Sequence, residues 1–100
     1  MNHYLLFYDV VDDFVAKRQP FREVHLAKVR GAHERAELIL AGALADPTDS
    51  AVLLFRAESS APIEAFAKTD PYVLNGLVTR WRVREWKTVV GQPADIAAAK

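Results

Sequence analysis

Three side chains capable of acid–base or anion-binding chemistry lie on one face of the first long helix that the sequence predicts. They are Arg18, Arg22 and His25, spaced by four and three residues. At about 100° per residue they share a stripe with Val29 and Ala32, which are typical of a core-facing surface. Cationic and titratable groups on such a stripe indicate a polar pocket near the amino end of the helix. The alternative is a partly buried histidine beside arginines whose apolar stems lie on the core while their charges stay in water.

The segment Asp70-Pro71-Tyr72 is the second candidate for chemistry. An aspartate followed by proline is a common helix opening, so capping alone is one interpretation. A capping carboxylate can also accept a hydrogen bond from a nearby imidazole, which would fix the tautomer of the ring and raise its basicity. Two compatible roles therefore stay open for Asp70, a helix cap and the partner of His25.

The remaining titratable residues give weaker signals. Asp9, near the end of the first predicted strand, could reach a pocket beside the first helix. His25 and His33 are eight residues apart, roughly 12 Å along a helix, which is too far to share a metal ion. Cysteines are absent, and the sequence has no glycine-rich phosphate loop, serine elbow or zinc-binding motif. We therefore expect neither a metal nor another cofactor.

The elements that must position these side chains follow one another without a long linker. Runs of apolar, aromatic and branched residues predict four strands, at 4–11, 38–44, 51–57 and 77–89. Helical spacing and helix-opening residues predict helices at 14–36 and 59–68 and a helical turn at 70–76. Pro20 can interrupt the first helix. Residues 1–90 then form one domain, and residues 91–100 form a small polar tail.

The order strand, helix, strand, strand, helix, strand is that of the ferredoxin-like α+β fold, with a four-stranded antiparallel sheet and helices on one face. The strands at 4–11 and 51–57 are apolar almost throughout, as central strands are. Two helices cover only one face of such a sheet, and the apolar side chains of the other face need a cover. We therefore expect a homodimer formed through the open sheet face.

The last predicted strand alternates in character, with Arg80, Arg82 and Arg84 on one side and Leu77, Trp81 and Val83 on the other. RNA-recognition domains share this order of elements, but their aromatic signature belongs on the third strand. Residues 52–56 contain one aromatic residue and no basic-glycine-aromatic run. A charged edge strand that discourages further pairing is the better interpretation.

The composition is that of a folded globular chain, since 51% of the 100 residues are hydrophobic and 26% are charged. Thirteen basic and thirteen acidic residues balance, which argues against nucleic acid or an anionic membrane as the main partner. The longest apolar stretch, at 38–45, is far shorter than the roughly 20 residues that cross a bilayer. The first residues lack a basic leader and soon reach Asp9, so we expect a cytoplasmic protein.

Three segments together make the sequence similar to the YCII-related (YciI-like) family. They are Arg22-Glu23-Val24-His25-Leu26, Leu40-Ala41-Gly42 and Asp70-Pro71-Tyr72-Val73-Leu74-Asn75-Gly76, and the resemblance spans nearly the whole chain apart from the last ten residues. It implies a dimeric, ferredoxin-like α+β barrel with one pocket in each subunit. The histidine and aspartate of the family's proposed active site fall on His25 and Asp70, with Arg22 and Tyr72 beside them.

The chain also departs from this family. Many members carry proline after the glycine of the second strand, where this sequence has Ala43, and the loop at 45–51 is short. Both differences can reshape the mouth of the pocket. Most members have no assigned reaction, and one group resembles a dehydrochlorinase of a chlorinated hydroxyquinol, so the resemblance does not fix a substrate.

Two functions from different classes follow. The first is a cofactor-independent enzyme that isomerises, eliminates from or hydrolyses a small cyclic or aromatic substrate. His25 would act as the base or acid, Asp70 would orient it, and the substrate would be bound by Arg22, Tyr72, Arg18 and Asp9. The second is a non-catalytic dimeric module that binds a ligand or serves assembly, which the absence of a known cofactor or nucleophile motif favours. A small oxygenase on the same kind of dimer is a third interpretation, which the lack of a visible haem or other metal ligand set disfavours, although cofactor-free oxygenases weaken that objection.

Overall fold

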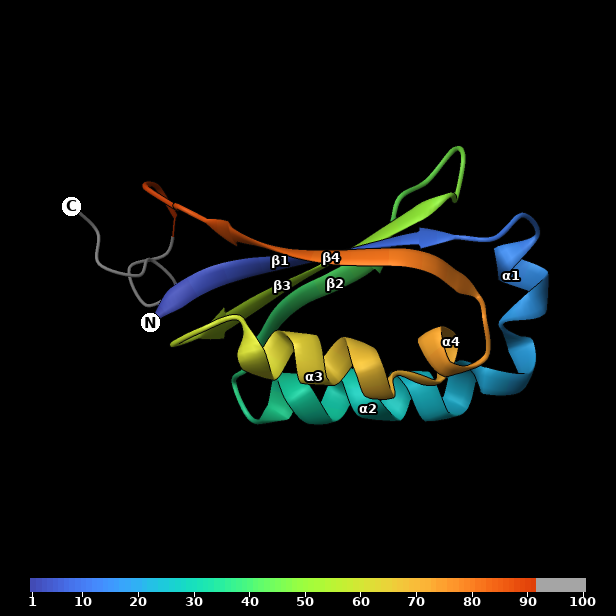
Figure 1. Ribbon diagram of the computed structural model, residues 1–100, viewed down its shortest axis with the longest axis horizontal. Helices are drawn as coiled ribbons and strands as arrows, with labels where there is room; N and C mark the ends of the chain where they lie inside the picture. Colours follow the sequence, from blue (N-terminus) through green and yellow to red (C-terminus); the bar gives the residue numbers. More distant parts are fainter. Residues whose placement is uncertain (92–100) are drawn as a thin grey trace.

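The four strands form one antiparallel sheet with the helices on one of its faces (Figure 1). The computed structural model describes residues 1–91. The strands are β1 (Asn2–Val10), β2 (Leu38–Ala43), β3 (Ser50–Ala57) and β4 (Val78–Trp86). Their order in the sheet is β2-β3-β1-β4, so β1 and β3 are central and β4 lies at an edge. The predicted ferredoxin-like α+β fold is confirmed, whereas the predicted tail beyond residue 91 falls outside the described residues.

The first predicted helix is divided at Pro20. It consists of α1 (Phe14–Lys17), a 3-10 turn η1 (Gln19–Phe21) and α2 (Arg22–Glu34). Proline has no backbone N–H and crowds the preceding turn, so the predicted interruption is confirmed. The carboxyl end was predicted two residues too late. Ala36 has a φ of 62°, a left-handed conformation that a right-handed helix cannot include.

The second helical segment is also divided, this time at Asp70. Helix α3 (Ala61–Thr69) ends there and α4 (Pro71–Leu74) begins directly after it. Asp70 has extended backbone angles, and its side chain accepts a hydrogen bond from the backbone N–H of Tyr72. The predicted cap is therefore present. Gly76 follows with a φ of 75°, which lets the chain turn out of α4 toward β4.

Alternation along β1 determines which side chains meet the helices. Tyr4, Leu6 and Tyr8 are buried and belong to the core with residues of α3 such as Phe66. Phe66 packs edge-on against Phe55 of β3, with 5.1 Å between the ring centroids. Because neighbouring side chains of a strand point to opposite faces, the inward direction of Tyr8 sends the next residue away from the helices.

The helices described within residues 1–91 all lie on one face of the sheet (Figure 1), and the strand register places a row of apolar side chains on the other face. The register pairs Leu5 with Leu54 and Phe7 with Val52. On the other side of β3, Leu54 is paired with Leu40 of β2, and 69% of the Leu40 surface is exposed. We call Leu5, Phe7, Leu40, Val52 and Leu54 the open-face row. The arginines of β4 point to this face too, since the Arg82 guanidinium lies 4.5 Å from the centre of the Phe7 ring.

None of the helices within residues 1–91 has the length and apolar character that spanning a membrane requires.

Candidate active site

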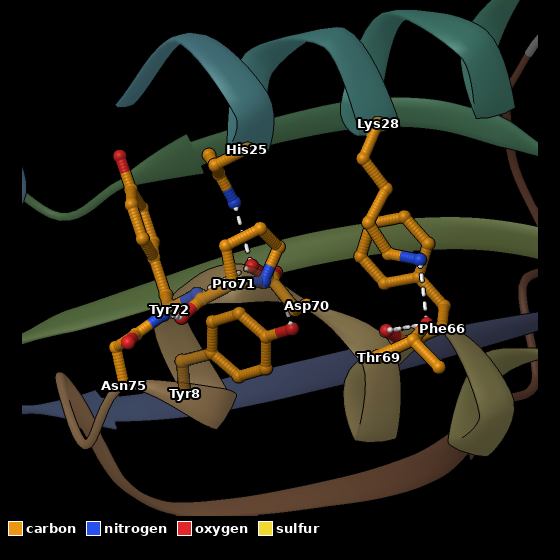
Figure 2. Close-up of polar contacts among 9 residues, drawn as sticks. All are labelled: Tyr8, His25, Lys28, Phe66, Thr69, Asp70, Pro71, Tyr72 and Asn75. Atoms are coloured by element: carbon orange, nitrogen blue, oxygen red, sulfur yellow. Dashed lines mark hydrogen bonds and ion pairs between the residues drawn. The ribbon is translucent and has the colours of Figure 1, made fainter. Parts of the chain in front are cut away.

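His25 and Asp70 meet between α2 and the junction of α3 with α4 (Figure 2). The Nδ1 atom of His25 lies 2.9 Å from Oδ1 of Asp70. An ionised carboxylate only accepts hydrogen bonds, so Nδ1 carries the proton and donates it. In the neutral ring Nε2 then holds a free electron pair. With 13% of its side chain exposed, His25 can present that nitrogen to a small molecule as a base.

Asp70 is completely buried and its two oxygens have three donors. Oδ1 accepts from His25 and from the backbone N–H of Tyr72 at 2.9 Å, and Oδ2 accepts from the hydroxyl of Tyr8 at 2.8 Å. In Figure 2 the carboxylate lies between the His25 ring and the Tyr8 hydroxyl. These hydrogen bonds satisfy a charge that would otherwise be costly to bury, and they hold the carboxylate in one orientation.

Tyr72 contributes more than its backbone. Its ring stacks on the imidazole of His25, with 3.8 Å between centroids and 12° between planes. This stack, together with the hydrogen bond to Asp70, fixes the plane of the imidazole and therefore the direction of Nε2. The Tyr72 hydroxyl is buried and has no hydrogen-bond partner within residues 1–91, which leaves it able to bind a ligand oxygen.

Arg18 and Arg22 lie with His25 and Tyr72 along a cavity of about 290 Å³. Neither guanidinium pairs with a carboxylate in the part of the chain that the structure describes. Arg18 is 5.2 Å from the centre of the Phe14 ring, and its buried Nε has no partner among the described residues. Two uncompensated cations beside a base suit a ligand with an ionised oxygen.

The opposite wall of the cavity is made of small and aliphatic residues from β2 and β3. They are Ala41, Gly42, Ala43, Ala51 and Leu53. None of these side chains is larger than leucine, so this wall is apolar and has little bulk. Such a flat apolar surface suits the face of a ring. Ala43, the position that departs from the family pattern, itself lines the cavity.

The structure thus brings together His25, Asp70, Arg22, Tyr72 and Arg18, but not Asp9. Asp9 is absent from the cavity lining because the alternation of β1 turns Tyr8 inward and Asp9 toward the other face. Tyr8 was not among the residues predicted from the sequence. In the sequence, the only indication for Tyr8 is the alternation of β1, which predicts that its side chain points inward. The same alternation predicts this for Tyr4, so it does not distinguish the two tyrosines.

A larger groove of about 520 Å³ lies between α2 and α3. Lys28 borders it, donates a hydrogen bond to Thr69 Oγ1 at 2.6 Å and lies 4.6 Å from the centre of the Phe66 ring (Figure 2). The groove lining includes Glu37 and Glu58 but no histidine. The acid–base pair therefore belongs to the smaller cavity. Within residues 1–91 no group of three or more histidine, aspartate or glutamate side chains is placed to hold a metal ion.

Fold and site together define a ferredoxin-like α+β protein with a histidine–aspartate pair on the wall of a small cavity. A sequence model of the YCII-related domain matches residues 1–87, and the chain belongs to that family. No curated protein matches the sequence.

Two solved structures resemble this one. The 5-chloro-2-hydroxyhydroquinone dehydrochlorinase TftG from Burkholderia phenoliruptrix AC1100, in complex with 2,5-dihydroxybenzoquinone, matches with a TM-score of 0.71 and 20% identity, over 85% of this chain and 93% of that one. Protein Atu4242 from Agrobacterium tumefaciens matches with a TM-score of 0.57 and 15% identity, over 93% and 98% of the two chains. At these identities the likeness establishes the fold.

Proposed function

We propose that this protein is a small-molecule enzyme that uses His25 and Asp70 as an acid–base pair on a small cyclic or aromatic substrate. The observation that carries the proposal is the 2.9 Å contact between His25 Nδ1 and Asp70 Oδ1 at the wall of a cavity of about 290 Å³. The reaction is an isomerisation, an elimination or a hydrolysis that needs no cofactor. Similarity in fold to a dehydrochlorinase of a hydroxylated ring supports this class of substrate.

In such a reaction Nε2 of His25 takes a proton from the substrate, and Asp70 stabilises the imidazolium that results. Negative charge then develops on a ring oxygen, where Arg22, Arg18 and the Tyr72 hydroxyl can bind it. In an elimination the leaving group departs with the electron pair of its bond, and the imidazolium afterwards returns its proton to the leaving group or to water. A positioned acid–base pair contributes about 10²–10⁴-fold in rate.

Incubation with a panel of hydroquinones and hydroxyquinones, with and without a chlorine substituent, tests this proposal. We expect at least one ring compound with an ionisable hydroxyl to be consumed, and absorbance and mass spectrometry would detect its loss. We also expect the ionised ring to bind about tenfold or more tightly than its methyl ether, because charge-assisted hydrogen bonds to arginine are lost in the ether. Binding of panel members without any consumption would instead support a non-catalytic ligand-binding module.

We further propose that a second copy of the chain covers the open-face row, which gives a homodimer. No helix within residues 1–91 covers this face, where Leu40 is 69% exposed and the other four side chains of the row are partly exposed. Burying these side chains between two copies would remove them from water at about 25 cal/mol for each Å² of apolar surface. This arrangement leaves the cavity of each subunit on the helical side of its own sheet.

Replacing Leu54, in the centre of the open-face row, with glutamate tests the dimer. Size-exclusion chromatography with light scattering should give twice 11.2 kDa for the wild type and 11.2 kDa for Leu54→Glu, because a buried unpaired charge opposes association. Leu74→Glu is the matched control, since Leu74 is 67% exposed on α4 and away from the sheet. A wild-type monomer at tens of micromolar would contradict this proposal.

A further inference from the structure

Tyr8 is the one side chain from the sheet that bonds to the acid–base pair among the residues described. It lies on the inward face of β1 with 1% of its surface exposed, and its neighbours across the sheet are Ala51 and Trp81. Its hydroxyl is 2.8 Å from Oδ2 of Asp70. Burial raises the pKa of Tyr8, and the negative charge of Asp70 raises it further, so the hydroxyl keeps its proton and remains the donor.

The hydrogen bond from Tyr8 complements the bonds at the other oxygen of the carboxylate. Oδ1 accepts from the backbone N–H of Tyr72 and from His25, while Oδ2 accepts from Tyr8. The backbone donor comes from α4 and the phenolic donor from the centre of the sheet, so two rigid elements fix the rotation of the carboxylate. Without the phenol, Oδ2 would lose its partner in a fully buried position, where a charged acceptor needs one.

We infer that Tyr8 is a positioning residue for the His25–Asp70 pair, since its hydroxyl holds Asp70 with Oδ1 toward Nδ1 and draws negative charge to Oδ2. This inference rests on the proposed function for its catalytic meaning. The physical coupling itself does not require a substrate. A carboxylate that shares its charge with a phenolic proton attracts an imidazolium less strongly than one without that donor.

Other charged and titratable groups around the pair are few. Arg18 follows α1 and Arg22 begins α2, and both line the cavity with the Tyr72 ring of α4. The parts of β2 and β3 that face the cavity contribute only alanine, glycine and leucine side chains. Both arginines keep their charge over the accessible pH range, so they add a constant field. A change at Tyr8 therefore acts on the pair itself.

The test is an NMR titration of the His25 ring in the full chain with Tyr8→Phe, in parallel with the pH profile of turnover. Loss of the phenolic donor leaves a more basic carboxylate, so we expect the midpoint of the His25 curve, and the acid limb of the profile, to move up by about one pH unit. Tyr4→Phe is the matched control. Tyr4 lies on the same face of β1, four residues and roughly 13 Å away, and its variant should leave both curves unchanged.

A second variant covers the case in which Tyr8→Phe does not fold. Placing 3-fluorotyrosine at position 8 keeps the hydroxyl but makes it a stronger donor, so the midpoint should move down instead. Unchanged midpoints in the variants that fold, or shifts equal to those of Tyr4→Phe, would overturn the role of Tyr8. The NMR titration needs no substrate. If no compound of the panel is consumed, the proposed function is refuted, but the titration still tests the role of Tyr8.

Discussion

His25→Asn is expected to lower turnover of a consumed ring by about 10²–10⁴-fold while the protein stays folded. The amide nitrogen of asparagine occupies nearly the position of Nδ1 and can still donate to Asp70. The variant therefore keeps a donor for the 2.9 Å hydrogen bond to Asp70 and removes Nε2, the atom assigned to proton transfer, together with the ring that stacks on Tyr72. Steady-state kinetics and thermal unfolding on the same preparation measure both effects.

The control for this variant is His33→Asn on the same helix. His33 is exposed, lies outside the cavity and has Nδ1 2.9 Å from the carbonyl oxygen of Leu38. The same amide replacement there should leave turnover within about twofold of wild type, as surface changes usually do. A His25→Asn protein that is folded and fully active would refute the assignment of His25 as the base.

Asp70→Ala is expected to lower the free energy of unfolding by about 3–5 kcal/mol, in addition to abolishing turnover. The carboxylate accepts hydrogen bonds from Tyr8, His25 and the backbone of Tyr72, and all three donors would lose their acceptor in a buried setting. For a domain of this size the melting temperature should fall by roughly 15 °C or more. Chemical and thermal unfolding followed by circular dichroism measure this loss.

Two comparisons separate charge from capping in this prediction. Asp70→Asn keeps an oxygen for the Tyr72 N–H, so it should lose less stability than Asp70→Ala but still impair turnover. Asp12→Ala, at an exposed loop position, should change stability by less than about 0.5 kcal/mol. An Asp70→Ala protein within 1 kcal/mol of wild type would show that the buried network is not a source of stability.

The fold could be predicted largely from the sequence because its patterns are local. Alternation and apolar runs place the strands, and Pro20 and Asp70 divide the helices where backbone chemistry requires it. The end of α2 was less predictable. Ala36 fits the helical stripe by its side chain, but its backbone is left-handed, and nothing in the identity of an alanine indicates that conformation.

For the candidate site too, the residues marked by a local pattern could be predicted, whereas those that depend on tertiary packing could not. His25 is marked by its position as a polar residue on a core-facing helix stripe, and Asp70 by its position as a helix cap. The family resemblance implies that the two belong to one site. Tyr8 could not be singled out, because Tyr4 shares its residue type, strand and face. Only the packing of the α3–α4 junction over the end of β1 gives Tyr8 a carboxylate. Asp9, by contrast, is turned to the other face by the alternation of β1 and does not line the cavity.

The most direct test of the central claim is a crystal structure with 2,5-dihydroxybenzoquinone as the probe. We expect the ring to lie in the cavity of about 290 Å³ against the small residues of β2, such as Ala41. One ring oxygen should then be within about 2.7–3.1 Å of His25 Nε2, and an ionised oxygen should contact Arg22 or Arg18. A probe found instead in the groove between α2 and α3, or a ring turned away from Nε2 while bound, would contradict it.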